Sequence, residues 1–297
     1  MPISTTHQHT LAQPAIFAGV GLHTGQHVRV AIRPAAPDHG VVFVRTDLTG
    51  DNRVPASGEM VVQTTLGTVI GNEAGATVST IEHLMAAMAA LGVDNALVEV
   101  DGPEVPIMDG SGLPFVALLD RAGRRRQEAS RLCIEVLEPV EVVDGDKRAA
   151  LLPCDRFEVA FSIDFPTAAI GRQSIDMEMD EQAFRDELAD CRTFGFLHEV
   201  EALRRMGLAR GGSLENAVVI DGDAVLNTEG LRRPDEFVRH KALDAVGDLY
   251  VLGHPLLARF EGERAGHAIN NAVVRALLQR PEAWRLVALG AELAEAV

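Results

Sequence analysis

Cysteine is scarce in this 297-residue sequence, which contains only Cys133, Cys154 and Cys191. Their number is odd and no two are closely spaced, so neither a disulfide framework nor a cysteine zinc site is expected, and a reducing compartment fits. Aromatic residues are also few, at 4% of the chain. Because hydrophobic residues together reach 47%, the core must consist mainly of Ala, Val, Leu and Ile.

Positive charge is in short supply as well, with 27 Lys and Arg against 43 Asp and Glu and a formal net charge of −16. A general nucleic-acid surface needs a basic face, so nucleic acid is not an expected partner. The sequence has no uncharged apolar stretch of about 18 residues, and residues 1–19 lack the basic and apolar segments of a signal peptide. We therefore expect a cytoplasmic protein without a membrane span.

A run of arginines from Arg121 to Arg126 stands out in this acidic chain. It favours a solvated helix end followed by a linker. At about 150 residues per domain, the length predicts two domains, and we place their boundary at this run, as residues 1–126 and 127–297. Short β-branched and apolar runs predict strands at 28–32, 41–44, 96–100, 132–136, 140–143, 157–163 and 217–220.

The two halves share a weak internal repeat of helix, glycine, strand, acid–glycine pair and helix. Its first copy comprises a helix over 80–91, Gly92, the strand 96–100, Asp101-Gly102 and a helix near 115–122. Its second copy comprises a helix over 235–252, Gly253, a strand over 256–262 that includes Glu261-Gly262, and a helix from Asn271. A duplicated unit of this kind predicts an α+β fold, with helices on one face of a mostly antiparallel sheet.

The predicted helix 235–252 carries a narrow charged stripe on an otherwise apolar surface, formed by His240, Lys241, Asp244 and Asp248. His240 and Asp244 are spaced i, i+4, so a ring nitrogen and a carboxylate oxygen can point to one place, as zinc ligation requires. Asp244 and Asp248 have the same spacing and repel each other unless cations lie beside them. The alternative is a solvated helix face with an ordinary salt bridge.

A second helix opens in the segment Ser79 to Leu84 and contains His83. This histidine lies opposite the apolar stripe, beside small alanines that would let another domain approach closely, so it could face the seam between domains. Glu82 has two interpretations. Ser79 and Glu82 fit a capping box, and a glutamate next to a metal-binding histidine can also serve as general base toward a water.

Four other segments carry weaker indications. Thr193 places a hydroxyl between bulkier groups and is as easily a turn or cap residue, while His267 precedes a predicted helix and is as easily a structural surface residue. The glycine-rich segments 19–25 and 108–112 lack the strand–loop–helix context of a phosphate loop, so we interpret them as tight turns.

A series of short motifs extends over nearly the whole chain. They are GVGLHTG at 19–25, STIEHL at 79–84, DN at 94–95, PIMDGS at 106–111, DGDK at 144–147, RTFGF at 192–196, GGS at 211–213, DEFVRHK at 235–241, LDAVGDL at 243–249 and GHAIN at 266–270. Together they resemble the UDP-3-O-acyl-N-acetylglucosamine deacetylase family, zinc enzymes of lipid A synthesis in Gram-negative bacteria. The combination is far more specific than any single motif.

The resemblance implies two pseudo-symmetric α+β domains, each a mostly antiparallel sheet layered against two helices, with the active site between them. It also implies that His83, His240 and Asp244 ligate Zn²⁺ and leave a position for water, with Glu82 as general base.

By the same resemblance, His267 would be a cation oriented by Asp248, stabilising the oxyanion together with the Thr193 hydroxyl. The implied substrate is a small molecule, acylated UDP-N-acetylglucosamine, which loses acetate in the committed step of lipid A biosynthesis. Lys241 and Lys147 match positions suited to the anionic nucleotide sugar. We expect the protein to be a monomer.

The resemblance also places Asp164 and Phe165 near the uridine, and it assigns the apolar stretch that begins at Phe194 and ends at Leu214 to the acyl-chain passage. From its residue pattern alone, this stretch is an amphipathic helix that core packing explains equally well. Two other functions remain open: a zinc amidohydrolase acting on a different acylated sugar or peptide, and a metal-stabilised nucleotide-sugar binding module without turnover.

Overall fold

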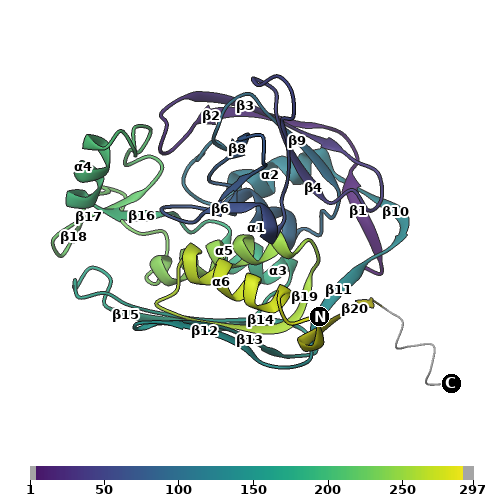
Figure 1. The fold of residues 1–297 in the computed structure, drawn as a ribbon. Helices are drawn as coiled ribbons and strands as arrows, with labels where there is room; N and C mark the ends of the chain where they lie inside the picture. The colour runs from purple at the N-terminus through teal and green to yellow at the C-terminus, as the bar shows by residue number, and fades with distance from the viewer. Residues whose placement is uncertain (1–4, 290–297) are drawn as a thin grey trace.

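Two β-sheets enclose the main helices in the computed structural model, which describes residues 5–289 (Figure 1). The first sheet has the strand order β2 (Ala15–Val20), β3 (His27–Pro34), β9 (Ala96–Val100), β4 (Val41–Arg45) and β5 (Arg53–Pro55). Along β3, Val28, Val30 and Ile32 are buried while the residues between them are more exposed, the alternation of a half-buried strand. The predicted α+β class is confirmed.

The second sheet contains seven strands: β12 (Val140–Asp144), β13 (Lys147–Pro153), β19 (Leu256–Glu263), β14 (Phe157–Asp164), β15 (Arg172–Glu178), β11 (Leu132–Val136) and β20 (Trp284–Ala288). Strand β19 pairs with β13, β14 and β11, and β20 pairs with β11. The strands predicted before and after the arginine run fall within observed strands, except that the one predicted over 217–220 starts one residue before β17 (Val218–Asp221).

The two sheets repeat one topology. In the order β2-β3-β9-β4-β5, all neighbours are antiparallel except the parallel pair β4 and β9. In the order β12-β13-β19-β14-β15, all neighbours are antiparallel except the parallel pair β14 and β19. The internal repeat seen in the sequence therefore corresponds to two copies of one α+β unit.

Each copy contributes two helices between the sheets. They are α1 (Glu82–Ala90) and α2 (Leu113–Ala122) in the first copy, and α5 (Glu236–Leu249) and α6 (His267–Leu278) in the second. Helix α5 is followed by the 3₁₀ turn η3 (Tyr250–Leu252), so the helix predicted over 235–252 ends in a tighter turn. Helix α6 begins at His267, four residues before the predicted start at Asn271.

Three small sheets and short helices complete the described chain. They are β1 (His7–Leu11) with β10 (Arg124–Ser130); β6 (Val61–Gln63), β7 (Val69–Gly71) and β8 (Thr77–Val78); β16 (Phe194–Phe196), β17 (Val218–Asp221) and β18 (Ala224–Val225); α3 (Glu181–Ala183), α4 (Leu197–Arg205), η1 (Gly58–Met60), η2 (Phe184–Leu188) and η4 (Pro281–Ala283). None of the helices within residues 5–289 is long and apolar enough to cross a membrane.

The arginine run begins at a helix end as predicted, because Arg121 lies in the last turn of α2, but the rest of the run is not a linker. Helix α2 ends at Ala122, and residues 124–130 form β10, which is antiparallel to β1 near the start of the chain. The division into residues 1–126 and 127–297 stays a prediction, and it would fall within β10. Both predicted domains include terminal residues, 1–4 and 290–297, that lie outside the described part of the chain.

Helices α1 and α5 cross in close contact at Gly247. A Cβ atom at this position would lie 2.0 Å from the carbonyl oxygen of Glu82 and 3.1 Å from the backbone nitrogen of Ala86. Ala86 and Ala87 are fully buried. The prediction that small residues around His83 allow a close approach is confirmed, and this crossing brings the two sequence repeats together at the site.

Candidate metal and catalytic centre

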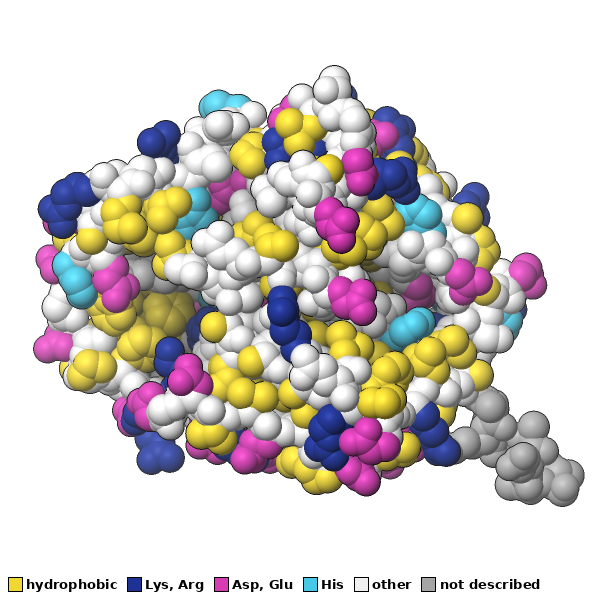
Figure 2. All heavy atoms as spheres, in the orientation of Figure 1, with side chains coloured by type: hydrophobic (Ala, Val, Ile, Leu, Met, Phe, Trp, Pro, Cys, Tyr) yellow, Lys and Arg dark blue, Asp and Glu magenta, His cyan; other side chains and the backbone are white. Residues whose placement is uncertain are grey.

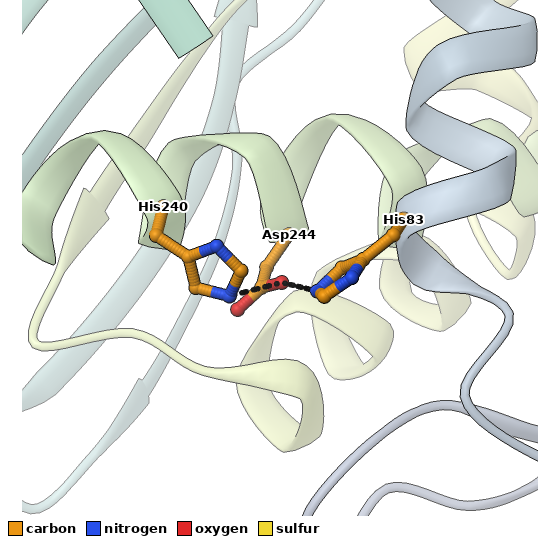
Figure 3. A group of neighbouring side chains, drawn as sticks. All are labelled: His83, His240 and Asp244. Atoms are coloured by element: carbon orange, nitrogen blue, oxygen red, sulfur yellow. Dashed lines mark ion pairs between the residues drawn. The ribbon is translucent and has the colours of Figure 1, made fainter. Parts of the chain in front are cut away.

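His83, His240 and Asp244 converge at the crossing of α1 and α5 (Figure 3). The Nε2 atoms of His83 and His240 lie 3.4 and 3.3 Å from the same oxygen, Asp244 Oδ1. One ligand atom from each residue lies within 4.8 Å of the other two, and all three residues are buried. Two residues come from one helix at i, i+4 spacing, and the third comes from the other sequence repeat.

The partners of these three residues fit a bound cation. Asp244 Oδ1 is buried and accepts no hydrogen bond within the described chain, which would be costly unless a cation satisfied it. His240 Nδ1 donates to the carbonyl oxygen of Cys191 at 3.0 Å, so its Nε2 lone pair faces the centre. Two imidazoles and a carboxylate are a donor set typical of catalytic zinc.

The charge states of these ligands suit the same role. Burial lowers the pKa of His240 to about 4, so this imidazole is neutral near pH 7 and able to ligate. Burial alone would raise the pKa of Asp244, but His240 and Lys241 outweigh it and hold that pKa well below its usual range. Lys241 Nζ donates to Asp244 Oδ2 at 3.0 Å, and this carboxylate raises the pKa of the lysine against the effect of burial.

Glu82 is not part of a capping box. The residue that caps α1 is Ile81, and the Ser79 hydroxyl donates instead to the carbonyl oxygen of Pro103 at 3.0 Å. Glu82 Oε2 accepts a hydrogen bond from the backbone N–H of Thr68 at 3.0 Å. Burial raises the pKa of Glu82, although the positive charge of His267 opposes the shift. A buried carboxylate with a raised pKa beside a metal site is suited to general-base chemistry.

The partly buried His267 pairs with the buried Asp248 beside the centre. His267 Nδ1 donates to Asp248 Oδ2 at 2.8 Å, and the amide of Asn270 donates to the same oxygen at 2.9 Å. His267 Nε2 lies 3.9 Å from both Glu82 Oε1 and Asp244 Oδ2. Burial alone would lower the pKa of His267, but the carboxylates, Asp248 foremost, raise it to about 9. His267 is thus a cation at neutral pH.

A cleft of about 550 Å³ opens onto this centre, and its lining includes His240, Asp244, His267, Lys241 and Thr193. Thr193 is held by its backbone, whose N–H donates to the carbonyl oxygen of Gly110 at 2.8 Å. A Cβ atom at Gly110 would lie 2.1 Å from the carbonyl oxygen of Asn216. The turn over 108–112 therefore packs directly against the backbone at Asn216.

The outer part of the cleft is apolar. Phe165 and Phe194 line it, with ring centroids 5.9 Å apart, and Leu197, Val200 and Leu203 of α4 line it too. None of the α4 residues is buried, so core packing does not explain this amphipathic helix. Hydrophobic side chains gather around α4 and β16 on the face shown in Figure 2.

Two predicted substrate residues do not line this cleft. Asp164 pairs with Arg264 at 2.6 Å, and Arg264 also pairs with Asp146 in the turn between β12 and β13. Lys147 follows this turn as the first residue of β13 and is exposed. Their place near a bound nucleotide stays a prediction.

The sequence prediction missed two side chains that hold the site together. Asn270 belongs to the quoted GHAIN motif and lies one helical turn after His267, so helical spacing could have found it. Thr68 has no comparable indication, because Glu82 is 14 residues away and Asp248 is 180 residues away.

Comparison with known proteins identifies the family of the chain. The model of the family described as UDP-3-O-acyl N-acetylglycosamine deacetylase (LpxC) matches residues 8–279. The UDP-3-O-acyl-N-acetylglucosamine deacetylase of Phenylobacterium zucineum is 72% identical over 98% of this chain and 99% of its own length. Proteins of the same name from Myxococcus xanthus and Shewanella frigidimarina are 50% and 49% identical, each over 96% of this chain and over 90% and 94% of their own lengths. The chain therefore belongs to the UDP-3-O-acyl N-acetylglycosamine deacetylase family.

Proposed function

We propose that this protein hydrolyses the N-acetyl group of UDP-3-O-acyl-N-acetylglucosamine, releasing acetate and the free amine in the committed step of lipid A biosynthesis. The names of its relatives support the substrate. The observation that supports metal-dependent hydrolysis is the buried Oδ1 of Asp244, which has no hydrogen-bond partner and lies between two histidines. It is at a cleft, with Glu82 and His267 nearby.

We assign a zinc ion to His83, His240 and Asp244. When bound, it would polarise the acetamide carbonyl and lower the pKa of an attacking water towards about 7. The chain's own groups handle the protons. Glu82 accepts a proton through Oε1, the oxygen that faces the centre, while Oε2 is held by the Thr68 N–H.

The charge that develops on the carbonyl oxygen is stabilised from the cleft walls. His267, cationic through Asp248, lies close enough to the centre to stabilise the oxyanion and to give its Nε2 proton to the leaving amine. The hydroxyl of Thr193, which also lines the cleft, donates to the same oxyanion.

The remaining substrate contacts follow from the lining of the cleft. The apolar outer part, with Phe194 and the α4 side chains, is suited to the acyl chain. Lys241 and Lys147 would supply positive charge to the diphosphate, which an acidic protein otherwise lacks. Asp164 and Phe165 would contact the uridine.

The test is an acetate-release assay on the acylated UDP-N-acetylglucosamine, with zinc-loaded protein and with chelator-treated protein. We expect turnover that chelation abolishes and added zinc restores. Zinc-loaded protein that binds the nucleotide sugar without releasing acetate would identify a binding module instead. Release from a different acylated sugar or a peptide, but not from this substrate, would reassign the substrate class.

A further inference from the structure

Thr68 contacts two carboxylates of the site at once, those of Glu82 and Asp248. It directly precedes β7, is 2% exposed, and makes one hydrogen bond to each carboxylate. Its backbone N–H donates to Glu82 Oε2 at 3.0 Å, and its hydroxyl donates to Asp248 Oδ1 at 2.6 Å. Because Glu82 starts α1 and Asp248 lies near the end of α5, one residue connects the general base on α1 with the carboxylate on α5 that orients His267.

The hydroxyl of Thr68 fixes the rotation of the Asp248 carboxylate. A carboxylate only accepts hydrogen bonds, so the threonine proton points to Oδ1. With Oδ1 held there, Oδ2 faces His267 Nδ1 at 2.8 Å and the amide of Asn270 at 2.9 Å. This arrangement places the Nδ1 proton of His267 on the side of Asp248 and directs Nε2 to the reacting centre.

The backbone of the same residue selects which oxygen of Glu82 is free. Oε2 is held by the Thr68 N–H, whereas Oε1 lies 3.9 Å from His267 Nε2. The preceding Gly67 leaves room for that oxygen, because a Cβ atom at Gly67 would lie 3.0 Å from Oε1. Residues 67 and 68 therefore both lie against the carboxylate of Glu82.

We propose that Thr68 is a positioning residue, which aligns Glu82 and the Asp248–His267 pair so that both face the reacting centre. The inference rests on the proposed function and deepens it. Proton transfer needs heavy atoms within hydrogen-bond reach in the reacting complex, so the loss of either alignment lowers turnover more than binding.

The test compares Thr68→Val with Thr68→Ser. Valine has nearly the shape of threonine but no hydroxyl, and both variants keep the backbone N–H. We expect Thr68→Val to lower kcat about 10- to 100-fold, the usual effect of losing a partner that orients a catalytic group, with KM changed less than about twofold. Thr68→Ser should recover most of kcat. Zinc content and melting temperature are measured for each variant and should match wild type.

A double-mutant cycle with Asp248→Asn separates positioning from a merely structural role. If the Thr68 hydroxyl acts through the Asp248 carboxylate, Thr68→Val should have little further effect on kcat in the Asp248→Asn background. Equal fold-losses of kcat in both backgrounds would overturn the proposal, as would full activity of Thr68→Val or failure of Thr68→Ser to recover it. A wild-type protein that releases no acetate would instead reject the proposed function.

A structure of Thr68→Val gives a readout that does not depend on turnover. We expect the Asp248 carboxylate to rotate and its 2.8 Å hydrogen bond to His267 to lengthen, while Thr68→Ser keeps both. An unchanged carboxylate in Thr68→Val would overturn the proposal.

Discussion

At the scale of single residues, the neighbours of Asp244 determine whether this predicted metal ligand is ionised. Burial alone would favour the neutral acid, but His240 and the ammonium of Lys241 keep it ionised. Lys241 occupies Oδ2, so Oδ1 is the oxygen left for a cation. The like-charge spacing of Asp244 and Asp248 on α5 is tolerated because each carboxylate has its own cationic neighbour, Lys241 for one and His267 for the other.

Glu82→Gln tests the general base at this scale. Glutamine can still accept the Thr68 N–H but cannot take a proton, so we expect the melting temperature to change little and kcat to fall by about 10² to 10⁴. The exposed Glu73→Gln is a matched control on the surface and should leave both quantities unchanged. A Glu82→Gln protein that is destabilised yet fully active per folded molecule would leave Glu82 with a structural role only.

The pH dependence of kcat tests the cationic state of His267. Its pKa is raised to about 9, so the cation is present below that pH and is lost as pH rises through it. We expect kcat to fall on the alkaline side in the same range. Asp248→Asn removes the main charge that raises this pKa, so the alkaline limb should move to lower pH and kcat should fall more than KM rises.

Two controls accompany this pH profile. Zinc content is measured in every variant, because a change at Asp248 could disturb Asp244 one helical turn away. An alkaline limb that is identical in wild type, Asp248→Asn and His267→Gln would assign it to a group other than His267.

Spacing within one helix indicated part of the site. His240 and Asp244 share a helix face, and the small alanines around His83 indicated a close neighbour, but only the resemblance to the family joined the three residues into one predicted ligand set. Glu82 was ambiguous because Ser79 matches a capping pattern whose geometry only the backbone reveals. Thr68 could not be predicted, since its partners lie on two distant helices.

At the scale of elements, the crossing of α1 and α5 sets the distance between ligands from the two repeats. Gly247 lies one helical turn after Asp244, and its missing side chain lets the two backbones meet. The contact is with backbone atoms of Glu82 and Ala86, which cannot move aside as a flexible side chain would. The glycine therefore determines how near His83 comes to Asp244.

Gly247→Ala tests this geometry. In an isolated helix, alanine in place of glycine would stabilise by about 1 kcal/mol. Here its methyl group would lie 2.0 Å from the Glu82 carbonyl oxygen, so we expect the helices to separate, at an overpacking cost of about 1–3 kcal/mol that cancels or outweighs this gain. Zinc affinity, measured by competition with a chelator, should fall as well. Unchanged zinc affinity in Gly247→Ala would contradict the proposed role of the crossing.

The predicted boundaries of elements were wrong in two situations. In one, side chains of the element point into the site, and in the other, the partner of a strand is distant in the sequence. Helix α6 was predicted to start late because His267 and Asn270 do not fit an apolar stripe, and both are directed at Asp248 instead. The arginine run looked like a linker because most of β10 is charged or polar, and its strand partner β1 lies more than 100 residues earlier in the chain.

At the scale of the whole molecule, the site depends on how two copies of one unit are joined. The sheets share a five-strand order, in which the third and fourth strands are parallel, but only α5 of the second copy carries His240, Asp244 and Asp248. The first copy contributes His83 and Glu82 at the start of α1. Duplication thus accounts for the scaffold, whereas the chemistry comes from residues that differ between the copies.

Because the ligands come from both copies, zinc should stabilise the whole molecule and not only its centre. Ligand present at about 100 times its Kd stabilises a protein by about 2.7 kcal/mol, so removing zinc should lower the melting temperature and adding it back should restore it. The effect should weaken as pH falls through the histidine range, since protonated imidazoles cannot ligate. His83→Ala removes the only ligand from α1 in the His83–His240–Asp244 group, so its melting temperature should no longer respond to zinc, whereas the exposed His27→Ala should respond like wild type. A wild-type melting temperature that ignores zinc, or an equal response in His83→Ala, would mean that the metal does not connect the two copies through these residues.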